Sequence, residues 1–153
     1  MNSKKHNQEK KCECFVVMPI GGKRNDTNKT FDEIYRYLIK TTVEGKNLRC
    51  VRADESSTPG SIIEDIRTHL ANSAIVIADI TGQNPNVLYE VGFRHGAKGR
   101  TILLAQNMAD VPFDLREHRV VIYDVTSPKG YHEAKKAIES HLEELLEGTQ
   151  LKM

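Results

Sequence analysis

Short apolar runs alternate with amphipathic stretches along most of the chain. Five of these runs are rich in β-branched residues and predict strands. They lie at residues 14–20, 48–52, 73–78, 101–105 and 119–125. In the stretches between and after them, apolar residues recur at helical spacing. This alternation predicts a five-stranded parallel sheet with helices on both faces, which is a three-layer α/β domain of the flavodoxin-like or Rossmann-like class.

Four helices are predicted. The first runs from about 31 to 43, with Thr30 as its cap, and the second covers 61–71. The last runs from about 131 to 146. The apolar residues expected to face inward in the first two are Phe31, Ile34, Tyr35, Leu38, Ile39, Ile62, Ile63, Ile66 and Leu70.

The third helix has the clearest start signal. Asn84 is a good N-cap, and Pro85 suits the first helical position because its missing N–H would be unpaired there. Residues 96–99, which include two glycines, are expected to end this helix.

Length and composition indicate one domain. A chain of 153 residues has room for a single core. We expect a tail at 1–12, a folded domain at 13–148 and a short C-terminal tail at 149–153. The formal net charge of +1 provides no field for holding a polyanion, so nucleic acid is not indicated as a partner.

Several classes of site are disfavoured. Cys12, Cys14 and Cys50 lack the spacing of a metal or redox motif, so free thiols in a reducing cytosol are expected. No group of His, Cys, Asp and Glu has metal-ligand spacing, and no serine stands in a nucleophile elbow. No apolar stretch is long enough for a signal peptide or membrane span. A cytoplasmic protein without metal or cofactor is therefore expected.

The segment from Ala78 to Gly92 is the most informative, because it runs from a strand through a polar turn into a helix. Open α/β sheets bind ligands at the carboxyl ends of their strands. Asp79 follows the third strand, and Glu90 falls early in the next helix. Two carboxylates converging there would resemble a nucleophile with a partner. The polar residues expected to support them are Asn84, Asn86, Tyr89 and His95.

Each acid also has an ordinary structural explanation. Asp79 could cap a turn, and Glu90 could pair with Arg94 four residues later on the helix surface. His95 could equally be a packed histidine.

Two further loops are expected at the same edge of the sheet. Gly21 and Gly22 would let the backbone approach a phosphate, with Lys23 and Arg24 assisting, although a flexible turn explains them as well. Asp54 follows the second strand, where an acid could bind a sugar hydroxyl or simply be solvated.

Four segments together resemble the nucleoside 2-deoxyribosyltransferase-like family, and more narrowly its bacterial TIR-like branch. The resemblance covers about residues 14–124. Its segments are Phe15-Val16-Val17-Met18-Pro19-Ile20, Arg52-Ala53-Asp54-Glu55, the 78–92 segment with His95, and Pro112-Phe113-Asp114-Leu115. The part Asn84-Pro85-Asn86-Val87-Leu88-Tyr89-Glu90-Val91-Gly92 is the most specific.

The resemblance implies roles for individual residues. Glu90 would attack the anomeric carbon of a nucleotide, and Asp79 would handle the proton of the leaving base. Asp54 would lie near the sugar. The floor of the pocket would be formed by Met18, Pro19, Ile20 and Gly21.

The resemblance therefore implies an N-glycosidase or glycosyltransferase-like enzyme acting on a deoxynucleotide, a ribonucleotide or NAD, in an antiphage setting. It also implies a homo-oligomer, because such transferases complete their pockets with a neighbouring subunit. Two alternatives stay open: a non-catalytic nucleotide-sensing module, and an interaction domain without a ligand.

Overall fold

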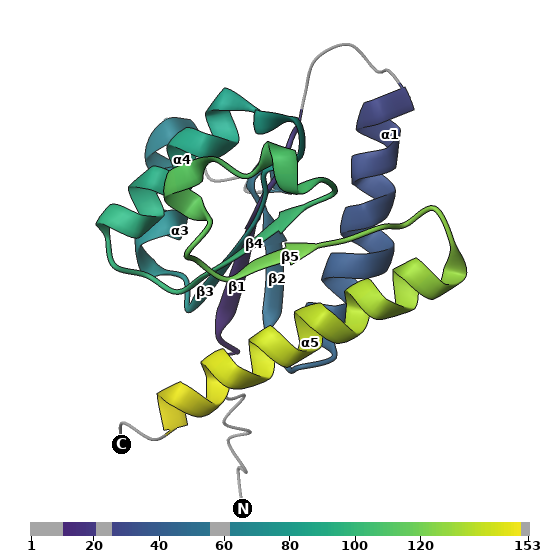
Figure 1. Ribbon diagram of the computed structural model, residues 1–153. Helices are drawn as coiled ribbons and strands as arrows, with labels where there is room; N and C mark the ends of the chain where they lie inside the picture. Colours follow the sequence, from purple (N-terminus) through teal and green to yellow (C-terminus); the bar gives the residue numbers. More distant parts are fainter. Residues whose placement is uncertain (1–10, 21–25, 56–61, 151–153) are drawn as a thin grey trace, which may run out of the picture.

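A computed structural model shows one five-stranded sheet, and the structure describes residues 11–20, 26–55 and 62–150. The strands are β1 (Glu13–Val17), β2 (Arg49–Arg52), β3 (Ile75–Asp79), β4 (Thr101–Ala105) and β5 (Val120–Ile122). All four neighbouring pairs are parallel, in the order β2-β1-β3-β4-β5 (Figure 1). This is the flavodoxin-like strand order, which confirms the predicted fold class.

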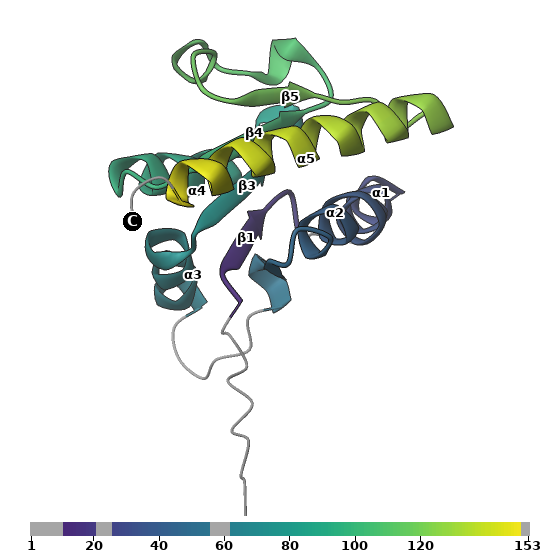
Figure 2. The same ribbon diagram turned by 90° about the horizontal axis from the view of Figure 1, so that it is seen from below.

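Helices cover both faces of the sheet. The main ones are α1 (Asp26–Glu33), the π-helix η1 (Ile34–Lys40), α2 (Thr41–Glu44), α3 (Ile62–Asn72), α4 (Pro85–Gly96) and α5 (Pro128–Gln150). Short 3-10 turns are η2 (Ala53–Glu55), η3 (Thr81–Gln83), η4 (Met108–Asp110) and η5 (Phe113–Leu115). In Figure 2, α3 lies on one side of the sheet and α1 and α2 lie on the other. The core contacts place α4 with α3, and α5 with η1.

Strand alternation divides the core into two halves. Successive side chains of a strand point to opposite faces. In β3, Ile75 and Ile77 therefore join the cluster under η1 and α5, whereas Val76 and Ala78 join the cluster under α3 and α4. All five residues of β3 are buried, as expected for a central strand covered on both faces.

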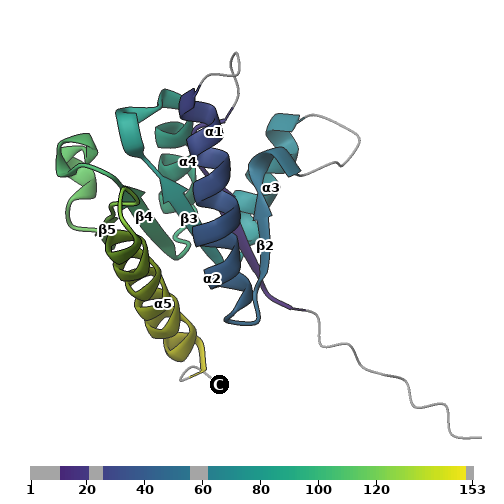
Figure 3. The same ribbon diagram turned by 90° about the vertical axis from the view of Figure 1, so that its right-hand side faces the viewer.

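The first helix is longer than its hydrophobic pattern indicates. It runs without a break from Asp26 to Glu44, because the junction residues Glu33 and Lys40 have helical dihedral angles (Figure 3). The prediction of Thr30 as its cap is wrong, since Thr30 lies inside α1. The predicted apolar stripe is confirmed: Phe31, Ile34, Tyr35, Leu38 and Ile39 are all buried. Hydrophobic periodicity marks only the turns that contact the core, so the polar first turns escape it.

Several other boundaries differ from prediction. β1 ends at Val17 rather than near Ile20, and β5 spans three residues rather than seven. β5 is short because its partner β4 ends at Ala105, which pairs with Ile122. Helix α5 continues to Gln150, past the start of the predicted C-terminal tail.

Three smaller findings complete the fold. Among the described residues, no helix is both long and apolar enough to cross a membrane. Cys12, Cys14 and Cys50 are free, as predicted. The predicted end of the third helix is confirmed, since α4 stops at Gly96 and Lys98 takes a positive φ of 57°.

Candidate functional site

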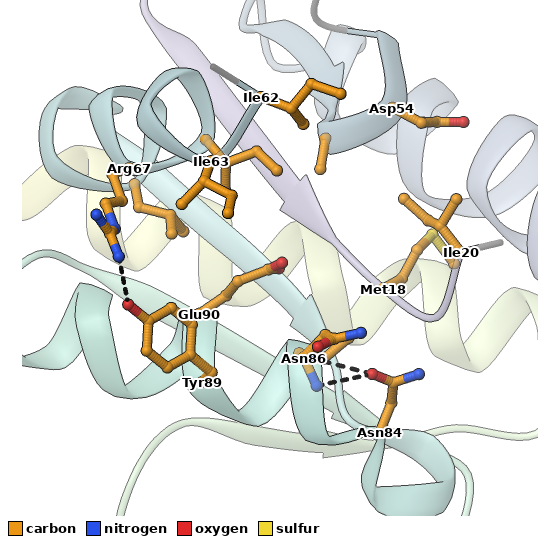
Figure 4. Close-up of a pocket in the computed structure, with 14 residues that line it drawn as sticks. Met18, Ile20, Asp54, Ile62, Ile63, Arg67, Asn84, Asn86, Tyr89 and Glu90 are labelled. Carbon is orange, nitrogen blue, oxygen red and sulfur yellow. Dashed lines mark hydrogen bonds between the residues drawn. The ribbon is translucent and has the colours of Figure 1, made fainter.

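A pocket of about 510 Å³ opens where the strand order reverses, beside β1 and β3. In sheets of this order, ligands bind in the crevice beyond the strand ends at that switch point. The volume is within the usual range for small-molecule sites. The described lining residues are Met18, Ile20, Ala53, Asp54, Ile62, Ile63, Ile66, Arg67, Leu70, Asn84, Asn86, Val87, Tyr89 and Glu90 (Figure 4).

Glu90 is the central polar group of this pocket. It projects from α4 into the space facing α3, and its side chain is half-buried (Figure 4). Within the described part of the chain, no hydrogen bond or ion pair reaches its carboxylate. Burial raises the pKa of Glu90 to about 7, and no neighbouring charge or hydrogen bond contributes to the shift. The group is therefore balanced between its charged and neutral forms near neutral pH.

The surface pairing considered for Glu90 does not occur. Arg94 is itself buried, and its guanidinium donates to the backbone carbonyls of Leu70 and Arg100 at 2.8 and 3.0 Å. Glu90 is therefore left without a counter-charge from its own helix.

Helix α3 supplies an apolar wall opposite Glu90. Ile62 and Ile63 are 75% and 59% exposed, so the prediction that they face inward to the core is wrong. They lie in the first turn of α3. They line the pocket instead, together with Ile66 and Leu70.

A hydrogen bond joins α3 to α4 at one end of the pocket. Arg67 Nη2 donates to Tyr89 Oη at 3.0 Å. Both side chains are largely exposed and both line the pocket. Arg67, on α3, is thus held at Tyr89, which is the residue before Glu90 on α4, and it does not pair with Glu90.

Two asparagines lie at the start of α4. The Asn84 side chain accepts hydrogen bonds from the backbone N–H groups of Asn86 (3.0 Å) and Val87 (3.3 Å), which confirms the predicted cap with Pro85 at the first helical position. This cap directs the first turn of α4 toward the pocket, so that Asn84 and Asn86 both line it.

Asp54 lines the far side of the pocket but already has a partner. Its two carboxylate oxygens accept hydrogen bonds from Arg52 at 2.6 and 2.8 Å. A third nitrogen of Arg52 reaches Asp32 at 2.7 Å, and its guanidinium lies 4.6 Å from the ring centre of Tyr35. Asp54 is therefore part of a fixed ion-pair network at the pocket wall.

Asp79 does not converge with Glu90, contrary to the prediction. It is fully buried and is not one of the lining residues. Its Oδ1 accepts hydrogen bonds from the Thr81 N–H and hydroxyl at 3.0 and 2.6 Å, and its Oδ2 accepts one from Tyr123. Burial raises the pKa of Asp79, although the hydrogen bonds from Thr81 and Tyr123 act against that shift. Strand alternation explains this position, because Asp79 lies on the same face as Ile75 and Ile77.

His95 and Pro19 also lie outside the pocket lining. His95 stacks on His118 with ring centres 4.2 Å apart, so it faces the 106–118 segment rather than α3. Burial, His118 and Arg94 together lower its pKa. The packed histidine considered from the sequence is the arrangement observed.

The phosphate-loop prediction at Gly21, Gly22 and Arg24 lies outside the described residues. Within those residues, no group of three or more His, Cys, Asp or Glu side chains could hold a metal ion.

Sequence reasoning thus located seven lining residues and missed the rest. Met18, Ile20, Asp54, Asn84, Asn86, Tyr89 and Glu90 were all predicted and lie together. The missed ones are Ala53, Val87 and the α3 residues. No sequence signal separates the α3 residues from core residues, because their helical spacing is also that of a face packed on a sheet.

Comparison with protein-family models and with curated proteins gives no match. Among solved structures, the chain is similar to a 2-desoxiribosyltransferase from Leishmania mexicana, with 10% sequence identity and a TM-score of 0.46. The similar region covers 62% of this chain and 65% of that transferase, so this chain spans just under two thirds of its length.

Proposed function

We propose that this protein is an enzyme that breaks the N-glycosidic bond of a nucleotide, with Glu90 as the group that acts on the sugar. The observation that carries the proposal is the state of Glu90: a half-buried carboxyl in an apolar pocket at the switch point, without a partner among the described residues. Structural carboxylates are normally paired when buried. An unpaired one in a cleft is typical of a functional group.

The chemistry follows from the charge that this reaction develops. Breaking the bond between C1′ and the base nitrogen sends the electron pair to the base and leaves positive charge on the sugar. The ionised Glu90 carboxylate stabilises that charge or forms a covalent ester at C1′. Water then adds at C1′, loses a proton to solvent and releases Glu90 and the phosphorylated sugar. A neutral base takes up a proton from solvent as it leaves, whereas nicotinamide leaves without one. Because Glu90 is half-buried, water screens this attraction less than it would at the surface.

The position of Asp79 affects the choice of substrate. A neutral base needs a proton when it leaves, and the buried Asp79 is engaged with Thr81 and Tyr123. Nicotinamide leaves from the cationic ring of NAD without needing a proton. This arrangement supports NAD-type nucleotides as substrates. Deoxynucleotides and ribonucleotides are the other two substrate classes in the proposal. We assign Asp79 a positioning role rather than the proton-handling role.

The test is release of free base or nicotinamide, measured by chromatography with deoxynucleotides, ribonucleotides and NAD. Wild-type protein should release product from at least one of them, and Glu90→Gln should abolish the release while keeping the fold. Glu64→Gln is the matched control, because Glu64 is exposed on α3 and does not line the pocket. The proposal fails for these substrates if wild-type protein releases nothing above the Glu90→Gln background.

A nucleotide-sensing module is the alternative from another class. The same pocket would bind a nucleotide without cleaving it, and the open mouth at the exposed Ile62 and Ile63 supports such binding. Ligand that raises the melting temperature and is recovered unchanged would indicate a sensor. For either function we also propose that the protein is cytoplasmic, acts in antiphage defence and forms a homo-oligomer. Light scattering at micromolar concentration tests the oligomeric state.

A further inference from the structure

Arg67 is the one basic side chain among the described residues that line the pocket. The other two charged lining residues are acidic, and Asp54 is already neutralised by Arg52. Within the described part of the chain, Arg67 forms no ion pair. Its hydrogen-bond partner is the neutral hydroxyl of Tyr89, at 3.0 Å.

The bond to Tyr89 keeps this cation separate from Glu90. Both residues line the same pocket, yet the pKa of Glu90 is set by burial alone, without a lowering contribution from Arg67. A free arginine beside an unpaired carboxylate would be expected to pair with it. The hydrogen bond to Tyr89 therefore leaves two separate charged groups in the pocket. The Glu90 carboxylate lies in the middle, and the Arg67 guanidinium lies at the end formed by α3 and α4 (Figure 4).

A guanidinium has five N–H donors in a planar fork, and Tyr89 takes one of them. Arg67 is exposed, so its remaining donors are accessible to a ligand. Phosphate oxygens match this fork in geometry and in charge. A nucleotide carries a sugar whose C1′ would meet Glu90 and a phosphate attached through O5′ at the opposite side of that sugar.

We propose that Arg67, held in place by Tyr89, binds the phosphate attached to the sugar and makes the pocket select nucleotides over nucleosides. The inference rests on the proposed function and adds to it the residue that determines the substrate class. Both a nucleoside monophosphate and a dinucleotide such as NAD carry this phosphate, so the two sources share one recognition chemistry.

The experiment compares each substrate with its unphosphorylated counterpart. The pairs are deoxyadenosine 5′-monophosphate with deoxyadenosine, and nicotinamide mononucleotide and NAD with nicotinamide riboside. Wild-type protein should favour the phosphorylated member by about tenfold or more in kcat/KM, the effect expected of a charge-assisted hydrogen bond. Arg67→Gln should remove most of that preference, by raising KM for the phosphorylated member.

Arg36→Gln is the control, because Arg36 is also an exposed helical arginine but does not line the pocket. It should keep the preference in full. Binding to Glu90→Gln, read by thermal shift, gives a second measure that needs no turnover. There too, nucleotides should stabilise the protein more than nucleosides, and a further Arg67→Gln change should remove the difference.

The outcomes separate this inference from the proposed function. Equal cleavage of phosphorylated and unphosphorylated substrates, or a preference that survives Arg67→Gln, overturns the role of Arg67 alone. Arg67-dependent binding of nucleotides without any base release supports the role of Arg67 and overturns the catalytic proposal. Neither release nor binding overturns both.

Discussion

Tyr123 donates a hydrogen bond to Asp79 across the end of β4, with Oη and Oδ2 2.5 Å apart. Gln106, which follows β4, completes the connection: its side chain donates to the Tyr123 hydroxyl at 3.2 Å, and its backbone N–H donates to the Thr81 hydroxyl at 3.1 Å. Thr81 in turn donates twice to Asp79. The carboxyl ends of β3, β4 and β5 are thus held together around one buried carboxylate, just before the turn that leads into α4.

This network predicts different results for two substitutions of Asp79. Asp79→Ala should lower the free energy of unfolding by about 2–4 kcal/mol, because it leaves the Thr81 and Tyr123 donors buried without an acceptor. Asp79→Asn should cost less, since its amide oxygen can still accept from Thr81 while its nitrogen donates to Tyr123. Urea denaturation at neutral pH measures both.

Base release separates a positioning role from a proton-handling one. Asp79→Asn should keep most of the wild-type release, because the turn before α4 stays in place. A well-folded Asp79→Asn protein without any release, beside an active wild type, would instead mean that the proton of Asp79 takes part in the reaction.

The position of Asp79 shows which features of the site could be predicted from the sequence and which could not. The five parallel strands and the location of Asp79 at the carboxyl end of the third one were predicted from the apolar runs and are confirmed. The direction of its side chain was available too, because Asp79 is two residues from Ile77. What the sequence could not indicate was which face α3 and α4 would cover. The face that a helix covers depends on the side of the sheet to which its crossover connection runs. Because α3 and α4 cover the face opposite to the Asp79 side chain, Glu90 lines the pocket and Asp79 does not.

Glu90 should destabilise the folded protein at alkaline pH. Its pKa rises from an ordinary value of 4.5 to about 7 on folding, so the folded state binds the proton more tightly than the unfolded state. The contribution of Glu90 to stability is therefore fully present below pH 4.5, falls as the pH rises toward 7 and is lost above it. Glu90→Gln cannot ionise, so at pH 8 it should be more stable than wild type by about 1–3 kcal/mol, discounted for partial exposure.

Chemical denaturation at pH 4.5 and pH 8 measures this difference. The gain from Glu90→Gln should shrink toward zero at the lower pH. Glu64→Gln, at an exposed site on α3, should show no such dependence. A Glu90→Gln protein that is no more stable than wild type at pH 8 would mean that the carboxyl is better solvated than its burial indicates.

The same titration should control the reaction. If ionised Glu90 acts on the sugar, kcat/KM should rise with pH and level off above an apparent pKa of about 7. Initial rates with the best substrate between pH 5 and pH 9 measure the profile. A rate that falls through this range would indicate that the protonated form of Glu90 is the active one.

The apolar wall of the pocket was the part of the site least accessible to sequence reasoning. Ile62 and Ile63 have the spacing of core residues, and helical periodicity cannot distinguish a face that packs on a sheet from one that faces a ligand. Arg67 was missed for a related reason. An arginine on the polar face of a helix is ordinary until its neighbour is known, and Tyr89 comes from a helix 22 residues further along the chain.

Gly99 should be intolerant of alanine because of Arg94. The Arg94 guanidinium is buried against the carbonyls of Leu70 and Arg100, and a Cβ on Gly99 would lie 2.1 Å from its Cζ. Arg94 cannot swing into solvent without leaving those carbonyls unpaired. Gly99→Ala should therefore lower the free energy of unfolding by about 1–3 kcal/mol.

Gly96→Ala is the matched control, three residues earlier at the end of α4. A Cβ there would meet no atom within 4 Å, so helix propensity should make the substitution neutral or slightly stabilising. Melting temperatures of the two variants, measured side by side, give the comparison. Equal stability of Gly99→Ala and Gly96→Ala would show that Arg94 has room to move, and that its buried charge does not hold the amino-terminal edge of the sheet against α4.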